Sequence, residues 1–97
     1  MEEALRAIAN PHRRAMLDLV WDGERSAGEI ARASGLSPPA ASQHLRVLRE
    51  AGLVYVRAEG NRRLYRSDPV RMAELRAALD AFWGERLGRM RDELEGR

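Results

Sequence analysis

The sequence contains no cysteine and no lysine. Without cysteine, the chain cannot form disulfides, thiolate metal sites or a thiol nucleophile. No apolar run approaches the roughly 20 residues that a membrane-spanning helix requires, and the amino-terminal residues MEEALR lack the apolar segment of a secretion signal. From these absences we expect a cytoplasmic protein that neither enters a membrane nor works by thiol chemistry.

Catalytic motifs are missing as well. Neither His12 nor His44 has an aspartate or serine partner in a recognisable motif, and no glycine-rich loop follows a predicted strand. We therefore expect a protein that is not an enzyme and that holds no cofactor.

The charge is unevenly distributed along the 97 residues, a length that predicts a single domain spanning residues 1–97. Residues 25–66 hold eight arginines against three glutamates, a net charge of +5, whereas the segments on either side are slightly acidic. A basic segment of this kind is typical of a surface that meets a nucleic-acid backbone, and a solvated basic face would give the same composition. Because arginine also fills the acidic ends, we attribute the absence of lysine to codon usage.

Residues 37–49 carry the strongest pattern in the chain. Ser37 is a favoured N-cap and Pro38 a favoured first helical residue, while Gly52 lies where a helix terminator is expected. One face of this predicted helix is an apolar stripe for a core, formed by Ala41, Leu45 and Leu48. The sequence therefore predicts an amphipathic helix with one buried and one free face.

The opposite face of this helix is small at its start, amide- and imidazole-bearing in the middle and cationic beyond: Pro39, Ala40, Gln43, His44 and Arg46. Small residues allow a close approach, and glutamine can pair with two atoms of an adenine edge. We interpret the segment as a helix that enters a DNA groove, with Gln43 and Arg46 reading bases. Ser37 and Ser42 are better suited to phosphate contacts, and His12 is expected to face solvent.

Three further helices are predicted before this one, at residues 2–9, from Asn10-Pro11 to about Trp21 with Gly23 as its stop, and from a capping box at Ser26–Glu29 to Gly35. Leu5 and Ile8 lie on one face of the first of these helices, and the inward residues of the other two are Met16, Leu17, Val20 and Ile30. The third and fourth helices form a helix-turn-helix, an outline that any pair of antiparallel helices would share.

A hairpin is predicted immediately after this pair, with strands at 53–57 and 62–66 and a turn at 58–61. A hairpin in this position is a wing. It places Arg57, Arg62 and Arg63 at its tip beside Asn61, where phosphates or a minor groove could meet them.

The last predicted helix runs from Asp68-Pro69 to about Glu95 and would extend roughly 39 Å, whereas a compact chain of this size has a radius of gyration of about 12 to 13 Å. Its apolar stripe consists of Leu75, Leu79, Phe82 or Trp83, Leu87, Met90 and Leu94. Part of that stripe must overhang the domain, so we expect a second chain to cover it. Trp21 and Trp83 are expected in the core or in that interface.

Three segments resemble the ArsR family of winged-helix transcriptional repressors: residues 10–14, 36–54 and 59–65. The likeness covers nearly the whole chain and implies a mostly helical winged helix-turn-helix, with four helices, two strands and a final helix. It further implies an inverted-repeat operator in double-stranded DNA, bound by a homodimer that is joined through residues 1–9 and 69–95. The implied DNA contacts are Ser37, Pro39, Ala40, Gln43, His44 and the wing arginines. The interface expected on this basis contains Leu5, Ile8, Leu75, Leu79, Phe82, Trp83, Leu87 and Met90.

The sequence departs from the family's metal sensors. The positions matching their thiolate motif are Ser26 and Gly28, which cannot bind such a metal, and the last helix has carboxylates but no histidine. The chain therefore resembles the members without a metal site, and we expect no metal ligands. No residue pattern specifies an inducer.

Two other functions stay open on the sequence. A winged-helix module can bind protein instead of DNA, an interpretation that the basic wing disfavours. A metal-responsive regulator could use carboxylate and histidine ligands, which the scarcity of histidine disfavours.

Overall fold

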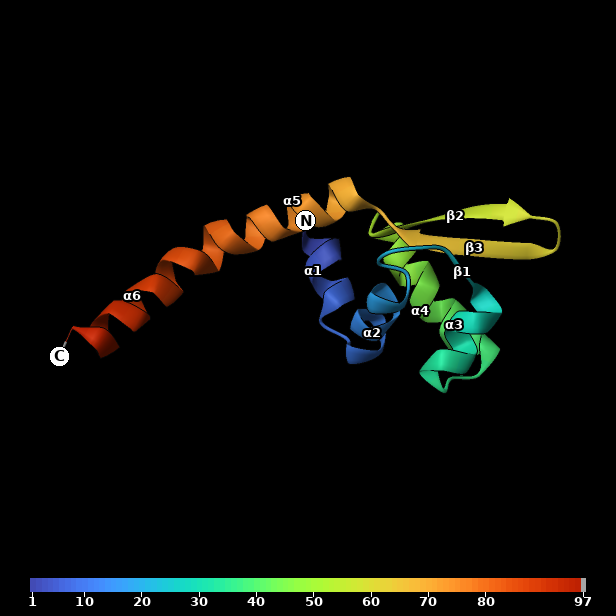
Figure 1. The fold of residues 1–97 in the computed structure, drawn as a ribbon, viewed down its shortest axis with the longest axis horizontal. Coiled ribbons are helices and arrows are strands. Elements are labelled where there is room, and N and C mark those ends of the chain that lie inside the picture. The colour runs from blue at the N-terminus through green and yellow to red at the C-terminus, as the bar shows by residue number, and fades with distance from the viewer. Residues whose placement is uncertain (97) are drawn as a thin grey trace.

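The computed structural model describes residues 1–96. Its elements are α1 (Glu2–Ile8), α2 (Pro11–Leu19), β1 (Arg25–Ser26), α3 (Ala27–Ser34), α4 (Pro38–Glu50), β2 (Val54–Glu59), β3 (Arg62–Ser67), α5 (Pro69–Leu79), a π-helical turn η1 (Asp80–Gly84) and α6 (Glu85–Glu95). Helices α1 to α4 form a body beside the sheet, and α5 to α6 continue as one rod that projects beyond it (Figure 1). The predicted winged helix-turn-helix is confirmed.

Local capping chemistry starts most of the helices. The side-chain oxygen of Asn10 accepts hydrogen bonds from the N–H groups of His12 and Arg13, at 2.8 and 3.3 Å, and Pro11 occupies the first helical position of α2. Ser37 in front of α4 and Asp68 in front of α5 use the same combination of a capping oxygen and a following proline. These starts are where the sequence predicted them.

The core lies where α2, α3, α4 and α5 meet the sheet. Its largest fully buried side chains are Met16, Val20, Ile30, Leu45, Leu48 and Leu53. Ala4 and Ala7 of α1 are also fully buried, and their small side chains let this helix pack closely against α2 and α4. The apolar stripe predicted for α4 is confirmed, since Ala41, Leu45 and Leu48 are each at most 1% exposed.

The sheet has three antiparallel strands in the order β1-β3-β2, whereas the sequence predicted only the two strands of the hairpin. The extra strand is two residues long, with Arg25 opposite Tyr65 and Ser26 opposite Leu64. The hairpin strands are also longer than expected. Glu59 pairs with Arg62, so the turn consists of two residues, and Gly60 takes a φ of +60° there.

Helix α2 ends earlier than predicted, at Leu19 instead of about Trp21. The reason is tertiary: the carbonyl of Val20 accepts a hydrogen bond from the N–H of Ser67 (3.1 Å), and the carbonyl of Trp21 accepts one from the Ser67 hydroxyl (3.4 Å). The chain leaves the helix to join the end of β3. The Trp21 and Trp83 side chains are each 49% exposed, so neither belongs to the core of this chain.

The last helix is continuous from Pro69 to Glu95 apart from the π-helical turn, and it overhangs the body as predicted. The molecule measures 60 × 25 × 22 Å and has a radius of gyration of 16.3 Å, well above the roughly 12 to 13 Å expected of a compact chain of this length. Within residues 1–96, no helix combines the length and the apolar character needed to cross a bilayer.

Candidate nucleic-acid interface

The helix-turn-helix is formed by α3, a tight turn and α4. Helix α3 ends because Gly35 adopts a φ of +65°, which lets the N–H groups of Gly35 and Leu36 donate to the carbonyls of Arg32 and Ala31. Ser37 then caps α4, and the buried stripe of α4 fixes this helix on the core. The remaining face of α4 is thereby turned outward.

The outward face of α4 presents the residues expected to contact DNA. Ser37, Pro39, Ser42, Gln43 and Arg46 are all exposed, and Ala40 is half-buried. Arg46 donates to the Glu50 carboxylate at 3.1 Å, with both side chains more than half exposed. Such a surface pair is worth at most about 1 kcal/mol, so a phosphate or a base edge can replace the carboxylate at little cost.

His44 sits at the edge of this face and has neighbours that the sequence did not indicate. Its ring lies 5.6 Å, centroid to centroid, from the ring of His12, with 30° between the planes. The Nη1 atom of Arg13 lies 3.3 Å from Nδ1 of His44. Because a guanidinium group only donates, Nδ1 is the acceptor and the proton of the neutral ring is on Nε2.

Burial of the ring lowers the pKa of His44 below 6.5, and the positive charges of Arg13 and of protonated His12 lower this pKa further. His12 is exposed as predicted, but its position against His44 places it beside the candidate interface. Since 31 residues separate Arg13 from His44 in the chain, only a correct placement of α2 against α4 could have revealed this cluster.

The arginines that follow His12 connect helices. Arg13 donates through Nε to the carbonyl of Ala7 (2.8 Å) and through Nη2 to that of Arg6 (3.1 Å), and Arg14 donates to the carbonyl of Ile8 (2.7 Å). These carbonyls are in the last turn of α1, where helical backbone partners run out, although the carbonyl of Arg6 also accepts from the N–H of Ala9 (3.2 Å). Arg13 therefore links the end of α1 to the edge of α4.

The wing arginines are arranged differently from the prediction. Arg57 is not at the tip: it lies opposite Leu64 and makes a two-point contact with the Glu24 carboxylate, at 2.6 and 2.9 Å. Arg62 pairs with Glu29 at 3.1 Å. The prediction that all three arginines gather at the tip is therefore wrong for Arg57; Arg62 and Arg63 do lie beside the turn, and Arg62 is held there by Glu29.

Near the tip, Asn61 and Arg63 are both exposed, and neither is in an ion pair within the described residues. The hydrogen bonds from Arg57 lower the pKa of Glu24. The pKa of Glu29 is lowered first by hydrogen bonds from Ser26 and then by the charges of Arg62 and Arg25. Both carboxylates are therefore charged at neutral pH, and Asn61 and Arg63 are the wing residues most available to a nucleic acid.

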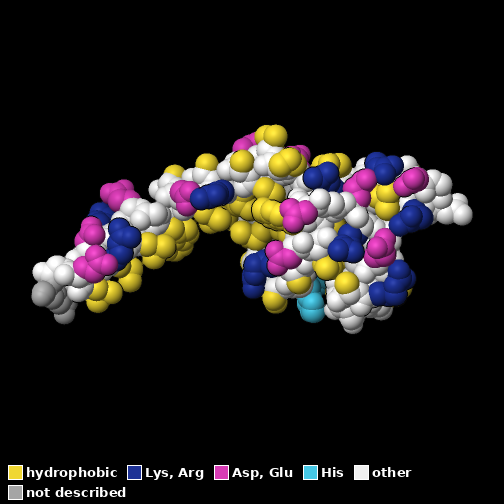
Figure 2. All heavy atoms as spheres, in the orientation of Figure 1, with side chains coloured by type: hydrophobic (Ala, Val, Ile, Leu, Met, Phe, Trp, Pro, Cys, Tyr) yellow, Lys and Arg dark blue, Asp and Glu magenta, His cyan; other side chains and the backbone are white. Residues whose placement is uncertain are grey.

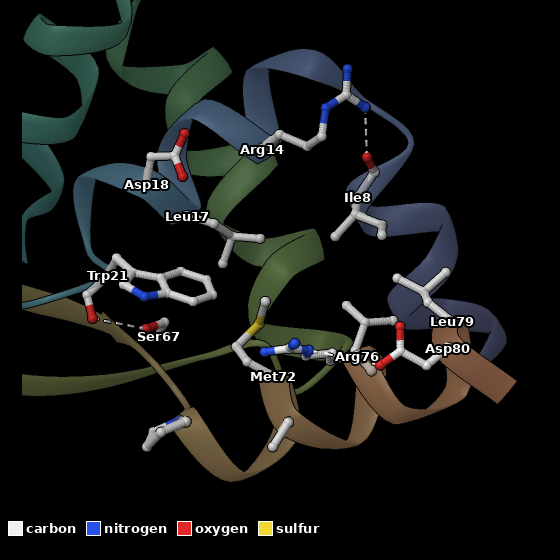
Figure 3. Close-up of a pocket in the computed structure, with 13 residues that line it drawn as sticks. Ile8, Arg14, Leu17, Asp18, Trp21, Ser67, Met72, Arg76, Leu79 and Asp80 are labelled. Carbon is white, nitrogen blue, oxygen red and sulfur yellow. Dashed lines mark hydrogen bonds and ion pairs between the residues drawn. The ribbon is translucent and has the colours of Figure 1, made fainter. Parts of the chain in front are cut away.

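A second surface lies away from α4, under α5 and along the rod. The apolar underside of the rod continues toward the body (Figure 2). There a groove of about 720 Å³ runs between α2 and α5, with Ile8 of α1 at one end. Figure 3 shows Leu17, Trp21 and Met72 along the groove, which is also lined by Arg14, Asp18, Arg76 and Asp80.

The residues expected at the dimer interface fall into three groups. Phe82, Trp83, Leu87 and Met90 are about half exposed or more on the overhanging rod, and Leu5 is 39% exposed on α1. Ile8 and Leu79 are partly buried against the core. Leu75 is only 3% exposed and packs in the core of its own chain, so its side chain is already covered and has little surface left for a partner.

The chain offers no clustered metal ligands in the part that the structure describes. No group of three or more histidine, aspartate or glutamate side chains within residues 1–96 is arranged to hold a metal ion. Several carboxylates of the rod are instead engaged with arginines, since Arg76 pairs with Asp80 and Arg89 with Glu85.

Comparisons with known proteins agree with this architecture. A family model described as "Bacterial regulatory protein, arsR family" matches residues 10–56. The HTH-type transcriptional regulator Rv2034 of Mycobacterium tuberculosis is 45% identical over 82 residues, which cover 84% of this chain and 77% of that protein.

Two solved structures extend the likeness. A crystal structure of a possible transcriptional regulator for arsenical resistance is 43% identical, with a TM-score of 0.84, and the match covers 94% of this chain and 95% of that one. The homodimeric winged helix-turn-helix DNA-binding domain Mb0332 of Mycobacterium bovis, solved in solution by NMR, is 37% identical, with a TM-score of 0.71, and the match covers 87% and 78%.

Proposed function

This chain belongs to the ArsR family of bacterial regulatory proteins, and on that premise we propose that it is a homodimeric, cytoplasmic repressor that binds an inverted-repeat operator. Transcriptional regulation through a winged helix-turn-helix DNA-binding domain comes with membership of the family. The dimer, the operator symmetry and the sign of the regulation are the proposal.

The observation that carries DNA binding is the free face of α4. Its side chains combine close-fitting Pro39 with Gln43 and Arg46, and all three are exposed. Gln43 and Arg46 can each pair with a base edge, a contact worth about 1 to 3 kcal/mol of discrimination. Ser37 and Ser42 flank them as phosphate donors, and Asn61 and Arg63 extend the contact through the wing.

The dimer is supported by the overhanging rod. Burying the exposed half of each large apolar side chain contributes on the order of 1 kcal/mol, and the rod carries several such side chains: Phe82, Trp83, Leu87, Met90 and Leu94. A two-fold arrangement lets the rod of each protomer cover the other. For the two copies of α4 to enter successive major grooves about 34 Å apart, this arrangement must place both of them on one side of the dimer.

The size of such a complex supports repression. The proposed dimer has no catalytic group and occupies about two turns of duplex, so its direct effect on a promoter that contains its site is to exclude other proteins. The operator would then be released by any change that weakens the dimer or its affinity for DNA.

The test is a selection of bound duplexes from a random pool with the full chain. We expect an enriched inverted repeat with half-site centres about 10 to 10.5 base pairs apart or a multiple of that spacing, and an affinity that falls steeply with salt. A Gln43→Ala, Arg46→Ala double variant should enrich no repeat. Enrichment of nothing over bulk DNA would contradict the proposal.

The sign of the regulation needs a second measurement. Transcription in vitro from a promoter that carries the selected repeat should fall as protein is added, and a promoter with a scrambled repeat is the control. A rise in transcript from the intact site would show an activator instead.

A further inference from the structure

We propose that His12 and His44 together bind one backbone phosphate of the operator and that operator binding therefore takes up a proton at this pair. The inference rests on the proposed DNA-binding function and adds His12, together with a dependence on pH, to the interface. It is carried by the contact between the two rings and by the position of the pair at the edge of α4.

The position of the pair follows from helix geometry. His44 is one residue after Gln43 and so lies about 100° around α4 from it. When the Gln43 face enters a major groove, the His44 edge is turned toward a sugar-phosphate strand beside the groove. The histidine side chains visible in Figure 2 form one patch at the surface of the body, away from the rod.

The two rings keep N–H donors that have no hydrogen-bond partner within residues 1–96. Nδ1 of His44 is occupied by Arg13, which leaves Nε2–H as the free donor of this ring. The exposed ring of His12 is 5.6 Å away. The N–H groups of His12 and Arg13 are already bound to Asn10, so a phosphate would be held by the imidazoles and not by the start of α2.

The charges around the pair disfavour protonation of His44 in the free protein. Within the described residues, the charged or titratable groups that act on its ring are Arg13 and His12, and both come from α2. No charged group of α1, α3 or α4 contributes to this pKa, and no carboxylate within residues 1–96 forms an ion pair with either ring.

A bound phosphate reverses this balance. Its negative charge favours the imidazolium form of a nearby ring, so the pKa of His44 rises in the complex from a value that burial and Arg13 hold low in the free protein. Because the complex then binds more protons than its separated components, operator affinity must rise as pH falls. The proton taken up goes to Nδ1 of His44, which can then no longer accept from Arg13, so the contact between these two side chains must open when the complex forms.

The experiment measures the dissociation constant of the full chain for the selected duplex between about pH 6.0 and 7.5 at constant ionic strength. For an average uptake of about half a proton over this range, we expect affinity to increase about fivefold from pH 7.5 to pH 6.0. A His12→Gln, His44→Gln double variant keeps a polar side chain at both positions but cannot be protonated, so it should lose this increase. Arg63→Gln is the matched control: it should bind more weakly at every pH and keep the fivefold increase.

A second readout does not depend on the affinity of a variant. Proton NMR follows the two imidazole C–H signals of the unmodified protein, free and bound to the duplex, and we expect at least the His44 midpoint to be higher in the complex. Midpoints that do not rise, a wild-type affinity independent of pH, or a double variant that keeps the fivefold increase would each overturn the inference. Absence of specific binding at every pH would instead overturn the proposed function itself.

Discussion

Helices α4 and α6 are built on the same amphipathic pattern but occupy opposite situations. The apolar stripe of α4 lies entirely in the core, with Leu45 and Leu48 at 1% and 0% exposure. The stripe of α6 lies beyond the body of its own chain, and its Leu87, Met90 and Leu94 are 57 to 73% exposed. The difference shows that periodicity identifies a face to be covered but not the chain that covers it.

The contrast also separates two kinds of free surface. On α4 the free face is polar and small, so it needs no partner for folding and is available to a ligand that comes and goes. On α6 the free face is apolar, and water is a poor environment for it. The first surface suits DNA and the second suits another protein chain.

The largest expected effect comes from a substitution in the buried stripe of α4. Leu45→Ala in α4 should lower the free energy of unfolding by about 2 to 5 kcal/mol, a large share of the roughly 5 to 15 kcal/mol of a small domain. Denaturant unfolding followed by circular dichroism measures it, with Leu87→Ala in α6 as the partner experiment under conditions where the chain is monomeric. Equal losses in the two monomeric variants would mean that the comparison is wrong.

The next largest effect is expected from substitutions in the exposed stripe of α6. Replacing Leu87 and Met90 by serine removes two apolar side chains from each protomer, and the four in the proposed homodimer are together worth about 4 kcal/mol. The dimer dissociation constant should therefore rise on the order of 1,000-fold, as measured by sedimentation equilibrium. Arg89→Ser, on the side of α6 where it pairs with Glu85, is the control and should leave the dimer intact.

A smaller effect sharpens the account of the α4 face. Gln43→Ala should cost about 1 to 3 kcal/mol for the selected duplex and relax specificity at one base position. Arg63→Gln in the wing should weaken all duplexes alike and reduce the slope of log affinity against log salt by about 1. Competition assays at several salt concentrations distinguish the two variants. A loss of sequence specificity in the Arg63 variant would show that the wing also reads bases.

The smallest effect concerns the half-buried edge of α4. Because the folded pKa of His44 is below its ordinary 6.5, the unfolded chain binds more protons between the two values, and the free energy of unfolding falls as pH drops through about 6.5. The difference between unfolding midpoints at about pH 7.5 and 5.5 should therefore be smaller in His44→Gln than in the wild type. A larger difference in the variant would refute the assignment.

The parts of this fold that were predictable depend on neighbours in the chain. Helix starts at Asn10-Pro11, Ser26 and Ser37-Pro38 rest on hydrogen bonds to residues two or three positions away. The α4 stripe and the overhang of the last helix follow from spacing and length alone. For the same reason, the outward residues of α4 could be named from the sequence.

The parts that were missed depend on distant residues. Strand β1 exists only because Arg25 and Ser26 find Tyr65 and Leu64, and Arg57 is held by Glu24, 33 residues away. The pairing of His12 with His44 has the same origin. The net charge of the basic segment was counted correctly. The count could not show, however, which of its arginines form ion pairs with glutamates.

The Glu29 carboxylate has a consequence beyond the start of α3. Its Oε1 atom accepts from the N–H of Ser26 and also from Nη2 of Arg62, so one oxygen joins the beginning of a helix to the hairpin. Together with the pairing of β1 with β3, this contact restrains the hairpin before a duplex arrives, so less ordering entropy is lost on binding. Loss of the Glu29 carboxylate would remove both the contact to the hairpin and one half of the capping box of α3.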